Sequence, residues 1–410
     1  MEMTLFVEVR KARGLEIAQS KRIEKLSEHL WVVPSQSNAG KYAVDPAKGT
    51  CLCPDYETNR LPCKHMYAVQ YARHQLVRPD GSSIVSETLR ISYPQKWPAY
   101  RAAQMNEKPI VQRFLKDLCA RVPQPEYKGN GRPSLSWSDV AYGICTTVYT
   151  GDSAFRAHSD VKDAATNGFI EDVAHPNTIL RYLAKPELTP ILTNLVHTSA
   201  APLAVVEENF AVDSTGFSTC TYARHVDHKH GKDTRVKKWI TLHAMVGVKT
   251  NVLTAVRASA NREGDAPYLP ALLNTTAATF TNIKEGSGDK AYISNKNLAA
   301  IEAVGATPYI DMRENLTLKG GKGAGKDAWE RLWHLVHFEK ERFVGHYHRR
   351  SNVESTFSAM KRVFGPAVRA KKNETAQVNE VLVKCLLFNT HVLVHEMFEL
   401  GIDVNFAESR

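Results

Sequence analysis

The sequence has few cysteines, and they do not form a disulfide framework. Its 410 residues include seven cysteines, an odd number, and four of them are scattered along the chain. Secreted domains that depend on disulfides are richer in cysteine and usually much shorter. The cysteine content therefore excludes a disulfide scaffold and favours a reducing cytosol.

The sequence also lacks a long uncharged hydrophobic run. The most apolar stretch, VLVKCLLFNTHVLVHEMFEL, is interrupted by Lys384, His391, His395 and Glu396. A membrane-spanning helix needs about 20 predominantly apolar residues, so we predict a buried helix here and no membrane partner. The opening MEMTLFVEVRKARG is apolar only briefly, so we expect no signal peptide and a cytoplasmic protein.

Acidic residues are fewer than basic ones, 43 against 53, which gives a formal net charge of +10. This excess favours a polyanionic partner, with nucleic acid the first candidate and a merely basic soluble enzyme the alternative. Hydrophobic residues make up 43% of the chain and charged residues 23%, an ordinary globular composition. The length allows two or three domains with a sizeable core.

Four regions follow one another along a chain without internal repeats. Residues 1–75 contain short strands and a Cys/His cluster, and residues 76–107 are expected to be a linker. Residues 108–204 read as several short helices. In residues 205–410, three strands are followed by a helix alternating with strands. This order predicts an α/β sheet in a single catalytic domain.

The predicted strands of the last region can be read from their β-branched runs. Two of them are joined at Lys249-Thr250, a hairpin signal. A helix closed by Gly305 separates the last two strands. The strands in order are ENFAVD, KKWITLHAMVGV, NVLTAVRAS, NIKEGSGDKAY and ATPYIDM.

Three cysteines and a histidine lie close together in CLCPDYETNRLPCKH. One residue separates Cys51 from Cys53, nine residues follow, and one residue separates Cys63 from His65. Three thiolates and one imidazole match a closed, tetrahedral, structural zinc site with no position left open for catalysis. A bound metal holds such thiolates without a disulfide in a reducing cell. The alternative is four unpaired residues that are close by chance.

The surroundings of this cluster resemble the SWIM zinc finger over residues 25–75. The strands HLWVVPS and KYAVDP precede the cluster, and the helix HMYAVQYARHQL follows it. Pro-Asp-Tyr after the first cysteine pair and the Cys-Lys-His entry to the helix belong to the same pattern. The resemblance implies a ββα fold around Zn²⁺ and binding to DNA or to protein, without deciding between them.

Two acids stand at predicted strand ends in the last region. Asp213 follows the strand in FAVDSTGF, and Asp289 follows Gly-Ser-Gly in KEGSGDKAY. Phosphoryl transfer relies on divalent metals, and Mg²⁺ prefers carboxylate ligands. Two or three acids brought together are therefore expected at such a site. Each of these residues alone is equally compatible with an ordinary turn.

A third acid, Glu354, lies among basic residues in GHYHRRSNVESTFSAMK. At 100° per residue, Tyr347, Arg350, Glu354 and Lys361 fall within an arc of about 60° on one predicted helix. A solvated charged face would not need the tyrosine and would include more acids. The neighbouring apolar stripe, expected to face the core, consists of Val353, Phe357, Met360 and Phe364.

The Tyr-x2-Arg-x3-Glu-x6-Lys spacing resembles that of bacterial insertion-sequence DDE transposases, over roughly residues 205–400. The order of the acids agrees, as does the wording of DSTGFST and AQVNEVLVKCLLFN. The resemblance implies an RNase H-like catalytic domain, a mixed sheet flanked by helices. It also implies metal-dependent cleavage and strand transfer at transposon ends, and a homodimer on DNA in the bacterial nucleoid.

Carried over residue by residue, the resemblance makes Asp213, Asp289 and Glu354 the catalytic ligands of two Mg²⁺ or Mn²⁺ ions. Tyr347, Arg350 and Lys361 then bind phosphates and the strand beside the break. The segment between Asp289 and Glu354 is too short for the large all-β insertion of some family members. A hairpin intermediate is therefore left open.

Several other stretches are candidates for contact with DNA. Residues 316–329 are Gly- and Lys-rich and are expected to form a flexible DNA-contacting loop. The histidines and Asp227 in RHVDHKHG are expected in a polar loop near DNA, with a second metal site as the alternative. VAHPNTILRYL, residues 173–183, is a candidate reading helix within a helical DNA-binding region. KKNE and VKK either follow a DNA backbone or are solvated surface.

Two rival functions remain open from the sequence. One is a transposase-derived DNA-binding regulatory protein that no longer cuts. The other is a nuclease on the same fold that cuts without joining. All three acids and the Tyr-Arg-Glu-Lys positions are present, which favours an active transposase.

Overall fold

The computed structural model forms two compact units, Met1–Pro94 and Gln95–Arg410, which are described separately. Side chains are not described for residues 73–87. The structure describes residues 10, 11, 13, 14, 16–18, 23–27, 29–36, 40–77, 83–87, 96–126, 130, 134–219, 239–260 and 264–406.

The smaller unit is built on an antiparallel sheet of four short strands. They follow in chain order as β1 (Glu24–Lys25), β2 (Trp31–Pro34), β3 (Lys41–Asp45) and β4 (Thr50–Cys51). Val33 and Val44 point from the two central strands into a small core. Both predicted strands are therefore present, within a larger sheet.

Two helices complete this core, α2 (Pro54–Asn59) and α3 (Lys64–Ala72). The predicted helix is present, but it ends at Ala72 rather than Leu76. There the chain enters a hairpin of β5 (Arg73–Val77) and β6 (Ser83–Glu87), in which backbone pairing replaces helical hydrogen bonds.

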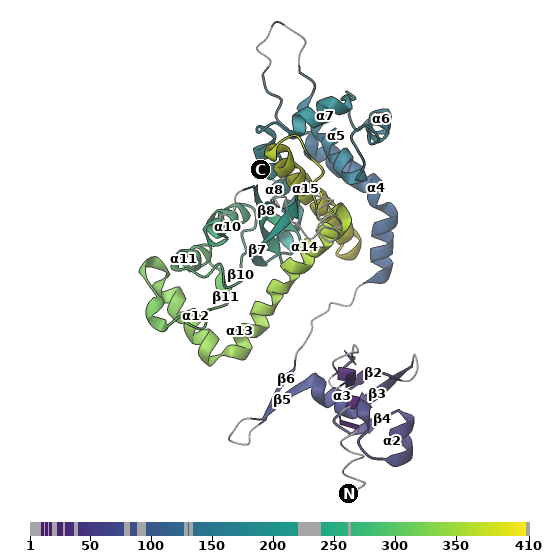
Figure 1. The fold of residues 1–410 in the computed structure, drawn as a ribbon, viewed down its shortest axis with the longest axis vertical. Coiled ribbons are helices and arrows are strands. Elements are labelled where there is room, and N and C mark those ends of the chain that lie inside the picture. The colour runs from purple at the N-terminus through teal and green to yellow at the C-terminus, as the bar shows by residue number, and fades with distance from the viewer. Residues whose placement is uncertain are drawn as a thin grey trace, which may run out of the picture. The chain divides into compact units, whose positions relative to one another are not determined.

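The larger unit contains a five-stranded mixed sheet in the order β11-β10-β7-β8-β9 (Figure 1). Strands β8 and β9 run antiparallel to their neighbours, as the predicted hairpin requires, whereas β10 and β11 are parallel to β7. All five predicted strands are present. Their bounds are β7 (Asn209–Ser218), β8 (Trp239–Gly247), β9 (Leu253–Ser259), β10 (Glu285–Gly288) and β11 (Thr307–Ile310).

A buried carboxylate fixes the turn between β8 and β9. Glu207 accepts hydrogen bonds from the backbone N–H and hydroxyl of Thr250, at 2.5 and 2.7 Å, and from the N–H of Lys249. Gly247 makes room for it, because a Cβ there would lie 2.5 Å from Cδ of Glu207. The turn predicted at Lys249-Thr250 is therefore stabilised by the side chain of Glu207 as well as by its own residues.

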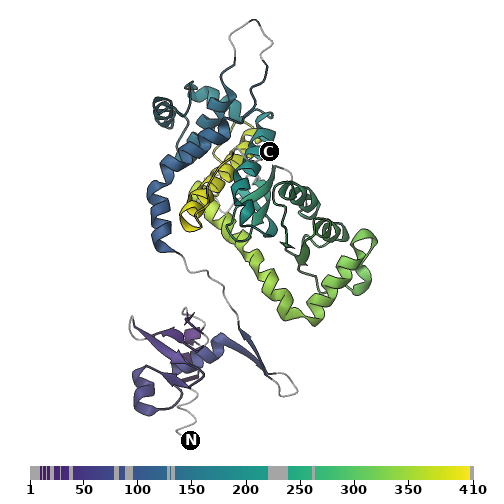
Figure 2. The same ribbon diagram turned by 180° about the vertical axis from the view of Figure 1, so that it is seen from behind.

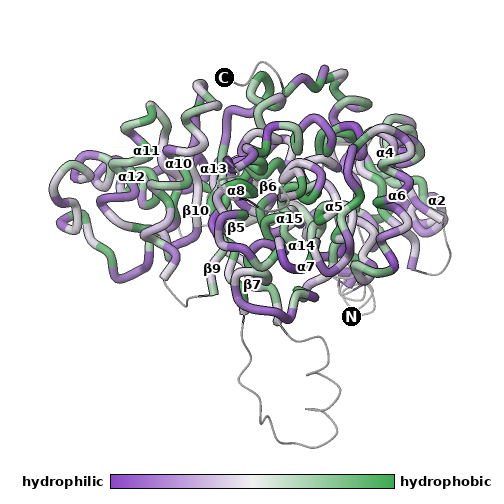
Figure 3. The backbone as a smooth tube through the Cα atoms, turned by 90° about the horizontal axis from the view of Figure 1, so that it is seen from above, coloured by the Kyte–Doolittle hydropathy of each residue, from purple (hydrophilic) through white to green (hydrophobic). Residues whose placement is uncertain are grey.

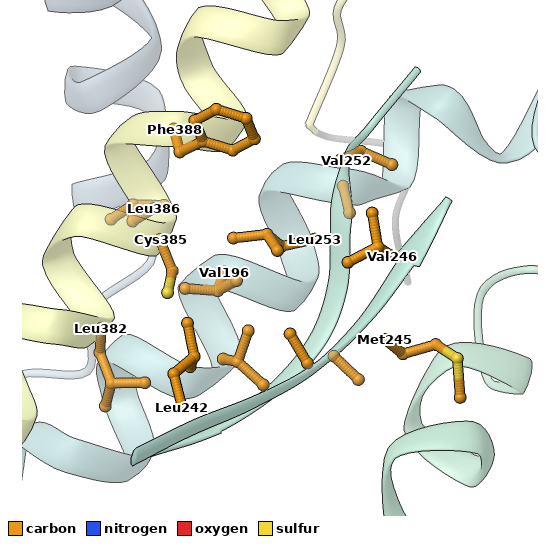
Figure 4. Packing of buried hydrophobic residues seen from close by; sticks show 14 of the residues in the cluster. Val196, Leu242, Met245, Val246, Val252, Leu253, Leu382, Cys385, Leu386 and Phe388 are labelled. Atoms are coloured by element: carbon orange, nitrogen blue, oxygen red, sulfur yellow. The ribbon is translucent and has the colours of Figure 1, made fainter. Parts of the chain in front are cut away.

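Helices cover both faces of the sheet. On one face lie α10 (Leu269–Ala277) and α11 (Asn295–Ala303), and on the other α8 (Leu188–Ala200), α14 (Ser351–Phe364) and α15 (Glu374–Glu399). Side chains alternate along each strand, so successive residues face different helices. Figure 4 shows the core formed by β8, β9, α8 and α15, with Leu242 and Leu253 directed towards α15.

The predicted helical region is formed by α4 (Trp97–Cys119), α5 (Trp137–Thr150), α6 (His158–Thr166), α7 (Pro176–Leu183) and α8. Helices α5, α6 and α7 lie together at one end of the larger unit (Figures 1 and 2). Helix α4 begins within the stretch 76–107 that was expected to be a linker. Since α4, α5, α7 and α8 all contact α15, this region shares one core with the sheet.

Helix α15 is the apolar stretch noted in the sequence. Its length and composition would suffice to cross a membrane, but 78% of its most apolar window is buried inside the protein. It lies among α5, α8 and α14 in the view of Figure 3. The prediction of a buried helix is confirmed within the described residues.

Lys384 of α15 is a buried cation that ties the helix to the chain before it. Its ammonium lies 3.4 Å from the Glu380 carboxylate and donates to the Ala367 carbonyl at 2.6 Å. Burial lowers the pKa of Lys384. We expect Lys384→Met to destabilise the protein by about 3 kcal/mol, because the buried Glu380 carboxylate then loses its counter-charge.

Thermal unfolding of Lys384→Met measures this effect. The matched control is Lys340→Met, at an exposed lysine that begins α13 (Lys340–Tyr347). The control is expected to melt with the wild type, and equal melting of the two variants would show that the buried pair contributes nothing.

Candidate active site and metal centre

The pairing of β7 with β10 places two acids side by side. In this parallel pair Val212 is opposite Gly288, so the next residues are Asp213 on β7 and Asp289 directly after β10. Neighbouring strands lie about 4.8 Å apart. The sequence predicted a strand end at Asp213, but β7 continues to Ser218, because β8 still pairs with it. Only the pairing of β7 with β10 ends here, at Val212.

The third acid is carried by a helix that crosses the same face. The segment around it was predicted as one continuous helix, but α13 ends at Tyr347 and a 3-10 turn, His348–Arg350, precedes α14. The predicted spacing of 100° per residue on one helix therefore holds only from Ser351 onwards, which includes Glu354 and Lys361. Arg350 nevertheless lies over the Tyr347 ring, at 5.8 Å from its centroid.

One guanidinium connects two of the three acids. Arg350 donates to Asp213 Oδ2 at 3.1 Å and to Glu354 Oε1 at 2.7 Å. Its side chain and that of Asp213 are less than a fifth exposed, whereas Glu354 is largely exposed. The structure therefore brings Asp213, Arg350 and Glu354 together, with Asp289 directly after the end of the adjoining strand β10.

The charges of this group act on one another. Burial raises the pKa of Asp213, and the charges of Asp289 and Glu354 raise it further. The Ser214 N–H and the Arg350 guanidinium act in the opposite direction. A partly buried carboxylate that two neighbouring acids destabilise as an anion belongs to a donor set that a divalent cation would stabilise.

Lys361 contacts β7 on the same side as Asp213. Its ammonium donates to Thr215 Oγ1 at 2.5 Å and lies 5.3 Å from the centroid of the Phe217 ring. Asp213, Thr215 and Phe217 alternate along one strand, so they share a face. Burial lowers the pKa of Lys361. Arg350 and Lys361 thus contact a single strip of β7, and Tyr347 and Glu354 lie against Arg350.

Sequence reasoning missed the anchor of the turn before α14. Glu285, at the start of β10, accepts from Arg349 at 3.2 Å and pairs with His346 at 2.7 Å. The His346 ring also stacks on Tyr309 of β11, with centroids 4.6 Å apart. These bases, which had no assigned role, fix the segment that presents Arg350. A single acid directly before Gly-Ser-Gly gave no distinctive signal in the sequence.

A second buried polar group lies on the opposite face of β7. His243, opposite Ser214 in the register, has Nδ1 3.3 Å from Asp265 Oδ1 and its ring stacked on Tyr268. Tyr292 is fully buried, and its pKa is raised first by burial and then by the charges of Asp265, Asp213 and Asp289. Asp265 therefore has a partner in the core, since it pairs with a buried histidine.

The four expected zinc ligands come together in the smaller unit. The ligand atoms of Cys51, Cys53, Cys63 and His65 all lie within 4.8 Å of one another, and all four residues are buried. His65 Nδ1 is 4.0 Å from the sulfurs of both Cys51 and Cys63. Tetrahedral zinc would hold such atoms about 3.6–3.8 Å apart, so the cluster fits Zn²⁺ after a small contraction.

Two thiols of the cluster shift each other's pKa in opposite directions. A hydrogen bond from Cys51 lowers the pKa of Cys63 to about 4, and the same contact raises the pKa of Cys51. A thiolate in a buried pocket of sulfur and imidazole ligands is the form that binds zinc. Among the described residues, no other group of His, Cys, Asp or Glu places its ligand atoms this close.

Comparison with protein families agrees with both sites. Residues 206–389 match the family model of the transposase DDE domain, and residues 36–74 match that of the SWIM zinc finger. The chain carries a transposase DDE domain and a SWIM zinc finger. No curated protein matches the chain in a sequence search.

The DDE domain includes all six residues predicted for catalysis and DNA contact, and the SWIM finger includes all four zinc ligands. Helices α4–α7 lie outside the matched range. The histidines of RHVDHKHG and the lysines at 237 and 238 lie outside the described residues.

The Gly- and Lys-rich stretch 316–329 of the DDE domain is held against α11. Asn295 donates to the Gly320 carbonyl at 3.1 Å and accepts from the Lys322 N–H at 2.9 Å. Trp329 donates to the Thr317 carbonyl. A Cβ at Gly325 would lie 2.0 Å from the Asn295 oxygen, so glycine here permits close packing. The expected flexible loop is instead a segment fixed by hydrogen bonds.

Proposed function

We propose that this protein is an active transposase that cuts the ends of an insertion element and joins them to target DNA. The observation that carries the proposal is the register of β7 with β10. It places Asp213 beside Asp289, on the face where α14 presents Glu354. The match to the transposase DDE domain supports the same function.

We further propose that the catalytic domain has an RNase H-like fold. The support is the strand order, with the first three strands antiparallel to one another and the next two parallel to the first. Helices on both faces agree with this architecture. Such a sheet gathers acids from neighbouring strands at one edge of the parallel pairing.

The three carboxylates would hold two Mg²⁺ or Mn²⁺ ions. When bound, these ions supply activation of the attacking oxygen and neutralisation of the leaving oxygen. The fit rests on the donor set, because Asp213 is already destabilised as an anion by burial and by its two acidic neighbours. A divalent cation held by these residues would relieve the repulsion that Asp289 and Glu354 impose on Asp213.

The basic residues around the acids would orient the DNA strand. Arg350 is planar and suited to two-point contact with a phosphate, whereas Lys361 acts as a point charge. The Arg350 guanidinium lies over the Tyr347 ring, which restricts the conformations of the arginine side chain. His346 and Arg349 position this segment through Glu285 and do not themselves reach the acids.

The remaining assignments follow from the same function. The zinc of the SWIM finger is structural, and the finger would bind DNA or a protein partner. A homodimer would hold two terminal inverted repeats together while both are joined to target DNA. The helices before β7 would recognise those repeats. In a bacterial cell the protein would be associated with the nucleoid.

A strand-transfer assay separates this function from its rivals. With Mg²⁺ or Mn²⁺ and pre-cut duplex ends, we expect joining to a target plasmid and no joining in EDTA. The joined product is detected by electrophoresis. DNA binding without cleavage or joining would instead indicate the regulatory protein. Cleavage without joining would indicate the nuclease.

A further inference from the structure

A hollow of about 340 Å³ lies between α7 and the loop that joins α14 to α15. Its lining consists of Asn177, Thr178, Leu180, Arg181 and Lys372. Asn177, Leu180 and Arg181 are exposed and occur at helical spacing, so they form one outer face of α7. The opposite face is buried by Ile179 and Leu183.

Two asparagines fix α7 against α15. Asn379, which is fully buried, donates to the carbonyls of Leu183 and Lys185 at 2.9 and 3.1 Å. Asn373 donates to the Ala184 carbonyl, and its oxygen caps the first turn of α15. The end of α7 is thereby held at a set position beside the loop.

The loop is equally constrained and carries several cations. Glu380 accepts from the backbone N–H groups of Arg369 and Ala370, at 2.8 and 2.7 Å. Arg369, Lys371 and Lys372 are exposed, while Glu374 in the first turn of α15 is the adjoining acid. With Arg181 across the hollow, the surface presents four cations on rigid elements.

We propose that the outer face of α7 and residues 369–372 bind double-stranded DNA. An α-helix fits the major groove, where Asn and Arg pair with base edges and an apolar side chain contacts a thymine methyl. The lysines would neutralise backbone phosphates. This inference rests on the proposed function, since it names the surface that holds the DNA being cut.

The distance from this surface to the acids suits one DNA end. The loop pairs with β7 at Ala367 and Ser218. In β7, Asp213 and Ser218 are about 17 Å apart, and from Ala367 to Lys372 the chain spans at most about 18 Å. The two bridged residues are themselves about 5 Å apart, so Lys372 lies within about 40 Å of Asp213, which is about twelve base pairs of duplex.

Binding of the full-length protein to a labelled, random-sequence duplex of about 30 base pairs tests the surface. We expect Arg181→Ala and Lys372→Ala each to weaken binding roughly tenfold, and Lys372→Ala to lower the salt slope by about one. The matched control is Arg101→Ala, an exposed arginine on α4 near the other end of α15, where Tyr100 contacts His395.

A cross-link provides a readout that does not depend on affinity. Leu180 replaced by p-benzoylphenylalanine is expected to cross-link to the duplex, whereas the same replacement at exposed Met105 of α4 is not. Normal affinity and salt slope in both variants, with no more cross-linking at Leu180 than at Met105, would overturn the proposal. If the wild type neither binds, cuts nor joins DNA, the proposed function itself fails.

Discussion

Asp213→Asn is expected to abolish DNA cleavage, with a loss of at least about 10³-fold, while duplex binding stays near the wild-type level. The amide keeps the shape of the side chain but loses the charge that holds a divalent metal. Because Asp213 is buried and repelled by Asp289 and Glu354, removing its charge has no large cost in stability. Cleavage of a duplex end in Mg²⁺, together with a binding titration, measures both effects.

The same result is expected for alanine at each of the three acids, Asp213, Asp289 and Glu354. The matched control is Asp117→Asn, an exposed acid on α4. It is expected to cut like the wild type. Full cleavage by any one of the three acid variants would contradict the assigned triad. Equal melting temperatures would exclude misfolding as the reason for a loss.

Zinc removal is expected to unfold the smaller unit and leave the larger one folded. Three of the nine buried apolar residues of its core are the cluster cysteines, so little else holds the unit together. Structural zinc sites contribute about 10–16 kcal/mol of apparent folding free energy at neutral pH. We expect Cys63→Ser or a strong chelator to make residues 1–94 sensitive to protease, while residues 95–410 keep their melting transition.

Metal content gives the direct measurement. One zinc per wild-type chain is expected, and much less in Cys63→Ser. Cys145→Ala is the control, since Cys145 is buried in α5 of the larger unit and the variant is expected to keep the wild-type zinc content. Zinc far below one equivalent in the wild type would refute the structural site.

The two sites differ in how much of their geometry the sequence could predict. The zinc ligands lie within 15 residues, and their spacing alone defines a four-ligand site. The strands of the larger unit were also readable, because β-branched runs and the turn at Lys249-Thr250 are local signals. The sequence pattern likewise identified α15 as a buried helix.

The acidic site depends on contacts between distant segments. The register that pairs Val212 with Gly288 puts Asp213 beside Asp289, and no local sequence pattern predicts that register. The break between α13 and α14 was missed for a similar reason, because Glu285 of β10 holds that turn through His346 and Arg349. Helical periodicity depends only on spacing within one segment, so it could not predict a contact with Glu285 on a distant strand.

The sequence by itself therefore determined which residue types were available: four zinc ligands, three acids, and a Tyr-Arg-Glu-Lys series. Tertiary structure decided that Arg350 lies between Asp213 and Glu354, and that α7 faces a basic loop nearly 200 residues later. The physical reason is the range of the interactions. Spacing along one helix or turn is fixed by local geometry, whereas strand register and buried hydrogen bonds are fixed only when distant segments share a core.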